Sequence, residues 1–357
     1  MLSRIQISSC HARLSSFVTA LLSTLILASL PSLVLAWPTD LPREEFSVEG
    51  YRTVRKYALI VGINEYESKD IPALRFAVRD AAALHKVITD PRSGDFRDEF
   101  VVLLTDSSGT PPTAANIGRS LTRLRAQARE NDLVLVFFSG HGYEEGGRAY
   151  LLPTDADLEA LDYTAIERDA FVRQIDSIVA KKVVVVLDAC HAGGISRGGK
   201  GVGEDAALSG RYYDQFSTSQ GRAFIASCSG GQLSWEDEKS GHGVFTESLV
   251  RGLAGEADST PEDGLVTLFE LRRFLEQDVS GWARRNGKEQ QPQVNLESAY
   301  GDMPLALNSD YLDDRAQWLA ERQRDAGELK MGLVSAGTLK SKELTHLELM
   351  NCIQKRL

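Results

Sequence analysis

Cysteine is scarce in this sequence, and the few cysteines lie far apart. Cys10, Cys190, Cys228 and Cys352 form no Cys-x-x-Cys pair, so neither a disulfide scaffold nor a zinc cluster is indicated. If the N-terminal segment is removed, three cysteines remain, and at least one of them then carries an unbridged thiol in an oxidising compartment. A bridge between Cys228 and Cys352 stays open on the sequence alone.

The sequence also lacks a nucleotide-binding glycine motif and an excess of positive charge. Neither G-x-G-x-x-G nor a P-loop follows the first apolar run, which leads into Gly62-Ile63-Asn64 and a polar loop. The formal net charge is −10 over 357 residues. Such an acidic chain is a poor candidate for general nucleic-acid binding, so no nucleic-acid partner is expected. The length suffices for one large domain with additions, or for two domains.

The N-terminus has the pattern of a secretory signal peptide. Arg4 and Arg13 precede an apolar run from Phe17 to Leu35, and Ala36 stands just before Trp37. This order of charged, apolar and small residues predicts a signal peptide over residues 1–36 and a secreted or periplasmic protein. The alternative is an uncleaved membrane anchor, which would give the protein a membrane contact. Serine, threonine and proline inside the run favour the signal peptide.

Short apolar runs alternate with segments of helical spacing from Tyr57 onward. Strands are predicted over 57–63, 100–104, 133–138, 183–187 and 223–226, and helices over 74–88, 114–129, 170–179, 243–252 and 267–284. This alternation implies an α/β fold with a mainly parallel sheet covered by helices on both faces. The predicted organisation is a linker over 37–55, one domain over 56–307 and a helical C-terminal tail over 308–357.

Two of the predicted strands are followed by unusual polar sequence motifs. Residues 134–138 lead into Ser139-Gly140-His141-Gly142, and residues 183–187 lead into Asp188-Ala189-Cys190-His191. Reactive residues gather beyond the carboxyl ends of strands in open α/β sheets. An imidazole near a thiol removes its proton and later protonates the leaving amine. We therefore predict Cys190 as nucleophile and His141 as base, with the backbone N–H groups of Gly142 and Cys190 donating to an oxyanion.

Three nearby residues imitate site residues and are interpreted otherwise. His191 adjoins the nucleophile but is expected to point elsewhere. Cys228 follows a predicted strand and is interpreted as a pocket wall. His242 stands in a second Gly-His-Gly sequence at the start of a predicted helix and is interpreted as part of its cap region.

The order of these motifs resembles the caspase-like cysteine peptidases, the peptidase C14-like clan of caspases and metacaspases. The similar blocks are 57–64, 74–81, 138–142, 188–193, 226–236 and 243–246. The resemblance covers residues 57 to 307 and implies a caspase-like three-layer αβα sandwich and cysteine-type endopeptidase activity. Asp188 stands where caspases carry Gln, and Ala192 stands where metacaspases more often carry Ser. The chain therefore resembles a bacterial-type relative.

The resemblance also suggests a substrate class. Metacaspases cleave after Arg or Lys with acidic pocket residues, and the matching acids are Asp80 and Asp188. A substrate guanidinium would relieve the mutual repulsion of two buried carboxylates. Cleavage after Arg or Lys is therefore predicted, with Ser227 and Ser234 as further substrate-binding residues. Arg75 is the one nearby feature that favours an Asp-specific peptidase instead.

The predicted loop over 192–221 is long, rich in glycine and serine, and basic. In caspase-like enzymes the corresponding segment is often cut during maturation, so self-processing is expected here. Its basic residues include Arg197, Lys200 and Arg211, and Arg222 directly follows it. Protein or peptide substrates are the expected partners, and the oligomeric state stays open.

No cofactor or metal is expected, with calcium activation as the alternative. The acids at 155, 157, 159 and 162 are loosely clustered but do not form an EF-hand loop. Two other functions stay open. One is a catalytically silent caspase-like module that binds or signals. The other is a different thiol enzyme on the same sheet, such as an acyltransferase or amidase.

Overall fold

The computed structural model describes residues 46–191, 222–229, 232–259, 261–295 and 301–335, with the backbone alone at 190–191 and 325–335. These residues lie in one compact unit that begins at Phe46. The expected signal peptide, the loop over 192–221 and Cys352 fall outside the described residues. Within the described part, no helix is long and apolar enough to cross a membrane.

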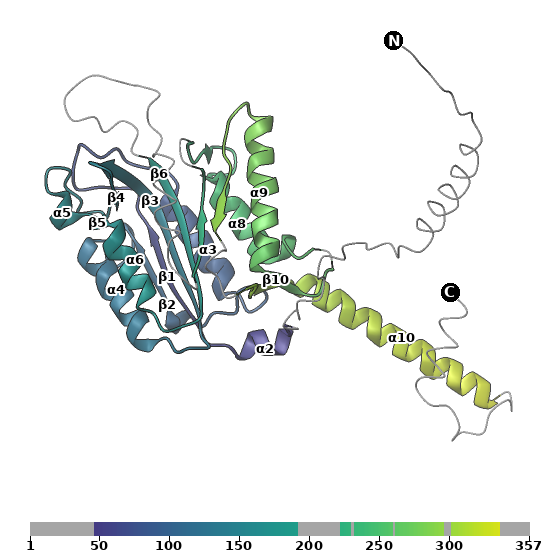
Figure 1. Cartoon of the computed structure of the whole chain (residues 1–357). Helices are drawn as coiled ribbons and strands as arrows, with labels where there is room; N and C mark the ends of the chain where they lie inside the picture. The colour runs from purple at the N-terminus through teal and green to yellow at the C-terminus, as the bar shows by residue number, and fades with distance from the viewer. Residues whose placement is uncertain (1–45, 192–221, 230–231, 260, 296–300, 336–357) are drawn as a thin grey trace, which may run out of the picture. The chain divides into compact units, whose positions relative to one another are not determined.

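An eight-stranded, mainly parallel sheet forms the centre of the domain (Figure 1). Its main order is β11-β7-β6-β3-β1-β2, and β4 and β5 extend it beside β3. Pairing is parallel from β7 to β2 and antiparallel at β11, β4 and β5. The strands are β1 (Lys56–Gly62), β2 (Val101–Thr105), β3 (Leu133–Glu145), β4 (Arg148–Leu151), β5 (Ile166–Glu167), β6 (Lys182–His191), β7 (Arg222–Ala226) and β11 (Gln293–Asn295).

Helices cover both faces of this sheet, which confirms the predicted three-layer α/β fold (Figure 1). Buried side chains of α3 (Ala77–Thr89), α8 (Val244–Arg251) and α9 (Leu268–Arg285) pack on one face. Those of α4 (Ala114–Gln127) and α6 (Arg168–Asp176) pack on the other. The remaining elements are α2 (Val48–Thr53), α5 (Leu161–Thr164), the 3₁₀ turn Asp98–Phe100, the π-helical turn Gly252–Glu256 and α10 (Ser309–Ser335). Two small two-stranded sheets complete the fold: the hairpin of β8 (Glu236–Asp237) with β9 (His242–Gly243), and β10 (Leu265–Thr267) with β12 (Pro304–Leu307).

The predicted linker over 37–55 contains an ordered helix that belongs to the domain. Ser47 caps α2, because its side chain accepts a hydrogen bond from the Gly50 N–H. Tyr51 is buried, and its hydroxyl lies 2.5 Å from the carbonyl oxygen of Gly94 and 2.7 Å from that of Leu305. Any linker among residues 37–55 therefore ends before α2.

The two site motifs lie inside strands, whereas the sequence placed them after strand ends. The β3–β6 ladder continues through Ser139↔Asp188 to Gly142↔His191. The last four residues of β3 also pair with β4, from Gly142↔Leu151 to Glu145↔Arg148. The run of large apolar residues in β6 ends at Leu187, whereas backbone pairing and burial continue beyond it through Asp188 and Ala189.

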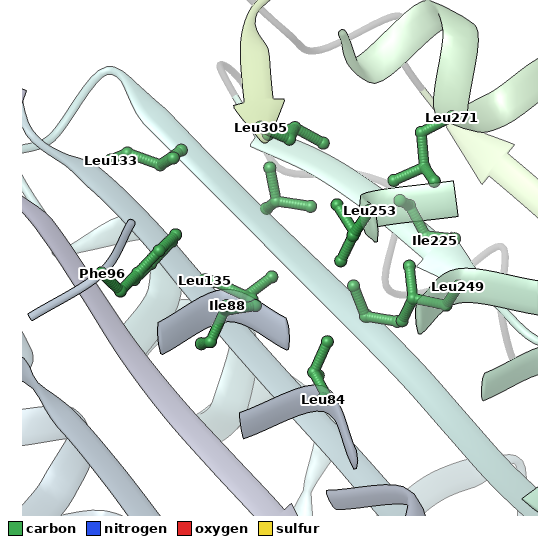
Figure 2. A pocket seen from close by; sticks show the side chains of 12 residues that line it. Leu84, Ile88, Phe96, Leu133, Leu135, Ile225, Leu249, Leu253, Leu271 and Leu305 are labelled. Carbon is green, nitrogen blue, oxygen red and sulfur yellow. The ribbon is translucent and has the colours of Figure 1, made fainter. Parts of the chain in front are cut away.

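A small apolar cavity of about 20 Å³ lies between the sheet and the layer of α3, α8 and α9 (Figure 2). Aliphatic and aromatic side chains line it, with no charged residue among them. It is a packing void of the core and is separate from the polar end of the sheet. Its lining includes Leu84, Ile88, Phe96, Leu133, Leu135, Ile225, Leu249, Leu253, Leu271 and Leu305.

Candidate active site

The strand register places positions 141 and 190 directly opposite each other. His141 in β3 and Cys190 in β6 are paired residues of a parallel ladder, and neighbouring strands lie about 4.8 Å apart. Paired positions share one face of a sheet. Val184 and Val186 of β6 pack under α3, α8 and α9, so positions 188 and 190 continue that face. The structure therefore brings the two predicted catalytic positions together through the backbone.

The His141 imidazole is fixed by the loop that follows β1. Its Nε2 atom lies 2.8 Å from the carbonyl oxygen of Pro72. Because a carbonyl can only accept, Nε2 carries the hydrogen and Nδ1 is the ring nitrogen able to take up a proton. The side chain is buried, at 3% exposure. The geometry thus selects one tautomer of the candidate base.

Tyr66 supports the same histidine from the main-chain side. The His141 backbone N–H donates to the Tyr66 hydroxyl oxygen at 2.8 Å, and the two rings lie 5.2 Å apart between centroids. A Cβ at Gly140 would lie 3.2 Å from that hydroxyl oxygen and 3.0 Å from the Phe138 ring. Glycine at position 140 therefore allows this close approach. Neither Tyr66 nor Pro72 belongs to a motif that identified it from the sequence.

Gly142, the predicted oxyanion donor, lies in β3 between two neighbouring strands. It is directly opposite His191 on β6 and Leu151 on β4. This placement puts its backbone one residue beyond the His141–Cys190 pair. The predicted oxyanion position is thus part of a paired strand end and not of a loose loop.

Asp188 is fully buried two positions before Cys190, on the same face of β6. Its Oδ1 accepts from the Ser234 hydroxyl at 2.8 Å and its Oδ2 from the Thr246 hydroxyl at 2.6 Å. Burial raises the pKa of Asp188, and these hydroxyl donors partly oppose the rise. Positions two apart in a strand are about 7 Å apart. A buried acid therefore lies next to the candidate nucleophile position.

Asp80, the second predicted acid, projects from the first turn of α3 into the same corner. Its Oδ1 lies 2.7 Å from His242 Nδ1, and its Oδ2 accepts from the Gly243 N–H at 3.0 Å. Burial raises the pKa of Asp80 to about 6; the charge of Asp188 adds to the rise, and the bond to His242 opposes it. His242 directly precedes Gly243, the N-cap residue of α8, so it lies in the cap region as predicted, and its imidazole also bonds to Asp80, which the sequence did not indicate.

Gly243 lies between the two carboxylates. A Cβ at this position would lie 2.9 Å from Asp80 Oδ2 and 3.3 Å from Asp188 Oδ2. The predicted acidic pair is therefore a real pair in space, although α3 and β6 are far apart in the sequence. The absence of a side chain at Gly243 therefore allows both carboxylates to pack against its backbone.

Ser234 takes part in this corner directly, and Ser227 lies beneath it. The Gln290 side chain donates to the Ser227 carbonyl oxygen at 3.0 Å and to the Ser234 hydroxyl at 3.3 Å. Ser227 is fully buried and lies close enough to lower the pKa of the Asp188 carboxyl. Cys228 is also buried, and its thiol donates to the Gln232 carbonyl oxygen at 3.4 Å. The serines thus support the acid.

Arg75 is paired with acids outside the acidic corner. Its guanidinium bonds to Glu236 at 3.0 Å and to Glu238 at 2.8 Å. A groove of about 580 Å³ adjoins this cluster, lined by residues that include Ser234, Trp235, Trp282 and Lys288. The feature that favoured an Asp-specific pocket therefore faces two glutamates.

Arg222 is unsuited to be a cleavage site in the predicted processing loop. It is the first residue of β7 and is buried. Its guanidinium donates to the carbonyl oxygens of Ala180 at 2.7 Å, Ile178 at 2.5 Å and Asp176 at 3.4 Å. Arg197, Lys200 and Arg211 fall outside the described residues.

The acids of the 155–162 segment make local bonds. Asp155 accepts from the Ala114 N–H at 2.8 Å, Asp157 accepts from the Glu159 N–H at 2.9 Å, and Asp162 pairs with Arg148. Among the described residues, no group of three or more histidine, cysteine or acidic side chains is arranged to hold a metal ion.

Known proteins similar to this chain are metacaspases. Metacaspase-7 of Arabidopsis thaliana is 32% identical over 39% of this chain and 35% of its own length. Metacaspase-6 of the same plant is 33% identical over 39% of each chain, and metacaspase-1 of Eremothecium gossypii is 30% identical over 40% of this chain and 32% of its own. The chain thus spans about a third of the length of these relatives.

One solved structure, protein GSU0716 from Geobacter sulfurreducens, aligns with 67% of this chain and 92% of its own at a TM-score of 0.44 and 16% identity. The fold assignment rests on the sheet order and layers described above. The family model of the caspase domain, Peptidase C14, matches residues 55–303. This match covers more than half of the chain and contains both site motifs and both acids. The chain therefore belongs to the Peptidase C14 family of caspase domains.

Proposed function

We propose that the protein is a cysteine endopeptidase in which Cys190 is the nucleophile and His141 the general base. The observation that carries this proposal is the pairing of His141 with Cys190 across β3 and β6. Because His141 Nε2 bonds to the Pro72 carbonyl oxygen, Nδ1 is the ring nitrogen that can take up a proton. Nucleophile and base within reach, with the base oriented by a third group, is the arrangement that thiol catalysis requires.

Catalysis then proceeds in two halves. Nδ1 of His141 takes the thiol proton, and the thiolate attacks the carbonyl carbon of the scissile peptide bond. Backbone N–H groups of Gly142 and Cys190 stabilise the oxyanion. The C–N bond breaks as the imidazolium passes its proton to the leaving amine, which leaves a thioester on Cys190. Water, deprotonated by His141, hydrolyses the thioester and restores the thiol.

Substrates are cleaved after Arg or Lys in this proposal, with Asp80 and Asp188 recognising the cation. Both carboxylates are buried, and both lie against Gly243, where a Cβ would meet each of them within 3.3 Å. A buried acid pair repels itself, and an incoming guanidinium relieves that repulsion while gaining charge-assisted hydrogen bonds. Among the described residues no cation pairs with Asp188, which receives only hydroxyl donors.

Processing and location follow from the sequence. The chain cuts itself after a basic residue of the 192–221 segment, and it is exported by the N-terminal signal peptide or held by it at a membrane. No metal is required for activity. Activation by added calcium, with loss of activity after chelation, would show instead that the enzyme needs this metal.

A fluorogenic peptide panel tests the core of the proposal. Peptides that differ only in Arg, Lys, Asp or Ala at the cleaved position are assayed with the wild type and with Cys190→Ala. The expected result is turnover of the Arg and Lys peptides by the wild type alone. Turnover of Asp peptides only would support the Asp-specific alternative.

The same two proteins address the remaining alternatives. A thiol-directed probe with an Arg recognition element is expected to label Cys190 far faster than free cysteine, whereas a silent module would show no such preference. Incubation of both proteins side by side tests self-processing. Identical intact bands would refute it.

A further inference from the structure

The acidic corner contains a basic side chain, the imidazole of His242, which pairs with Asp80. Its side chain is 24% exposed, whereas the Asp80 side chain with which it pairs is 3% exposed. The imidazole is held by the β8–β9 hairpin, in which His242 lies directly opposite Asp237. A second contact fixes this hairpin to α3, because Arg79 donates to the Gly241 carbonyl oxygen at 3.1 Å.

The two buried carboxylates differ in the groups that stabilise their charge. Asp188 accepts from hydroxyl groups, which stabilise an anion without supplying charge. Asp80 has an imidazole at 2.7 Å and one backbone N–H. Burial and the nearby Asp188 both favour the protonated form of Asp80, and His242 is the largest influence in the opposite direction. The charge on Asp80 therefore depends on one side chain.

We infer that His242 is a positioning residue of the specificity pocket, which keeps the Asp80 carboxylate ionised and oriented so that a substrate cation meets a charged acid. The inference rests on the proposed Arg/Lys specificity and assigns His242 a role within it. His242 acts through Asp80 and takes no part in the bond-breaking steps.

The charged groups around His242 act in both directions. Asp80 and Glu247 favour the imidazolium, and Arg79 opposes it, with the net result that the pKa of His242 is raised. The bond to Asp80 is the largest cause. The groups facing this corner from the packed elements are Arg79 and Asp80 on α3, Asp237 on β8, Glu247 on α8 and, beyond Asp80, Asp188 on β6.

A pH window follows from these directions. Asp80, with a pKa of about 6, is ionised at neutral pH and protonates below that value. KM for an Arg peptide is therefore expected to rise as the pH falls through about 6. Without His242 the pKa of Asp80 moves upward, so the same rise in KM begins near neutral pH. The turnover number changes little, because Asp80 contacts the substrate away from the bond that breaks.

Three variants measure this effect. For His242→Ala we expect KM for an Arg peptide at pH 7 to rise roughly tenfold or more, and to return toward the wild-type value at pH 9. His242→Asn keeps a hydrogen-bond donor near Asp80 and is expected to recover part of the loss. His85→Ala is the matched control. His85 lies on α3, the helix that carries Asp80, and pairs with Asp98 at 3.0 Å, so its loss is expected to leave KM unchanged.

A binding measurement separates this inference from the proposed function. Arginine amide is titrated calorimetrically into Cys190→Ala and into Cys190→Ala with His242→Ala, at pH 7 and pH 9. Weaker binding to the double variant at pH 7 and equal binding at pH 9 support the role of His242 even if no peptide is cleaved. Superimposable KM–pH profiles of wild type and His242→Ala, or equal or absent binding in both proteins at both pH values, overturn it.

Discussion

His141 and position 190 are brought together by one strand ladder, whereas Asp80, Asp188 and His242 come together from a helix, a long strand and a short hairpin. In the first region, the backbone pairing of β3 and β6 fixes the distance between the two positions, and the Tyr66 hydroxyl and the Pro72 carbonyl support His141. In the second, the side chains themselves hold the arrangement through hydroxyl, imidazole and N–H contacts to two acids. Changes in the first region are therefore expected to abolish the reaction, and changes in the second to alter which substrate enters it.

The largest effect is expected in the ladder region. Cys190→Ala and His141→Ala should each lower kcat/KM by at least about a thousandfold, because each removes a reacting group. The unfolding temperature should change little for Cys190→Ala, since the ladder is made by the backbone. Steady-state kinetics and thermal unfolding measure the two quantities. Activity retained in either variant would assign the chemistry elsewhere.

The next effect is expected in the acidic corner, at Asp188. Asp188→Asn should lower kcat/KM for Arg peptides by roughly thirty- to a hundredfold, because a charge-assisted contact is lost. Burial raises the pKa of the Asp188 carboxyl, so the folded state disfavours its charged form. At a pH above the ordinary pKa of an aspartate, this carboxyl therefore lowers the stability of the wild type. The variant should therefore be no less stable than the wild type at pH 7. A stability loss with unchanged specificity would mark Asp188 as purely structural.

A smaller effect is expected from the support of His141. Tyr66→Phe removes the acceptor of the His141 backbone N–H but keeps the ring. Loss of one such hydrogen bond is worth about 1 kcal/mol, so kcat should fall roughly fivefold with KM unchanged. The pH profile of kcat distinguishes positioning from folding, because misplacement of the imidazole shifts it. An unchanged kcat would show that the ladder alone fixes the base.

The smallest effect on activity is expected far from both regions, at α2. Tyr51→Phe removes the hydroxyl that bonds to the carbonyl oxygens of Gly94 and Leu305. We expect a loss of roughly 1–2 kcal/mol in the free energy of unfolding and unchanged kinetics. Urea unfolding monitored by fluorescence gives the value. No loss of stability would return α2 to the status of a linker.

The comparison also separates what the sequence could predict from what it could not. Apolar runs in β1, β3 and β6 predicted the parallel sheet, because a strand that is buried on both faces needs an unbroken run of apolar residues. The same signal could not show that pairing continues past Leu187, since backbone hydrogen bonds leave no compositional trace. Motif position sufficed to nominate His141 and Cys190.

The partners of the acids were harder to find. Asp80 and Asp188 came from a resemblance, and the resemblance included the block that contains Thr246 without assigning it a role. His242 was interpreted as part of a cap region, because its Gly-His-Gly sequence stands at the start of a predicted helix. Its pairing with Asp80 depends on the fold of a two-residue hairpin, which sequence spacing does not predict. The second Gly-His-Gly was the only available signal.

The anchoring of Arg222 has a consequence for any cut made in the segment before it. Its guanidinium grips three backbone carbonyl oxygens of the α6–β6 connection, and β7 pairs with β6 over five residues from Val183↔Arg222 to Leu187↔Ala226. A severed chain would keep both strands in register. Two bands on a denaturing gel should therefore migrate as a single particle under native conditions, and covalent continuity would be dispensable for holding the halves together.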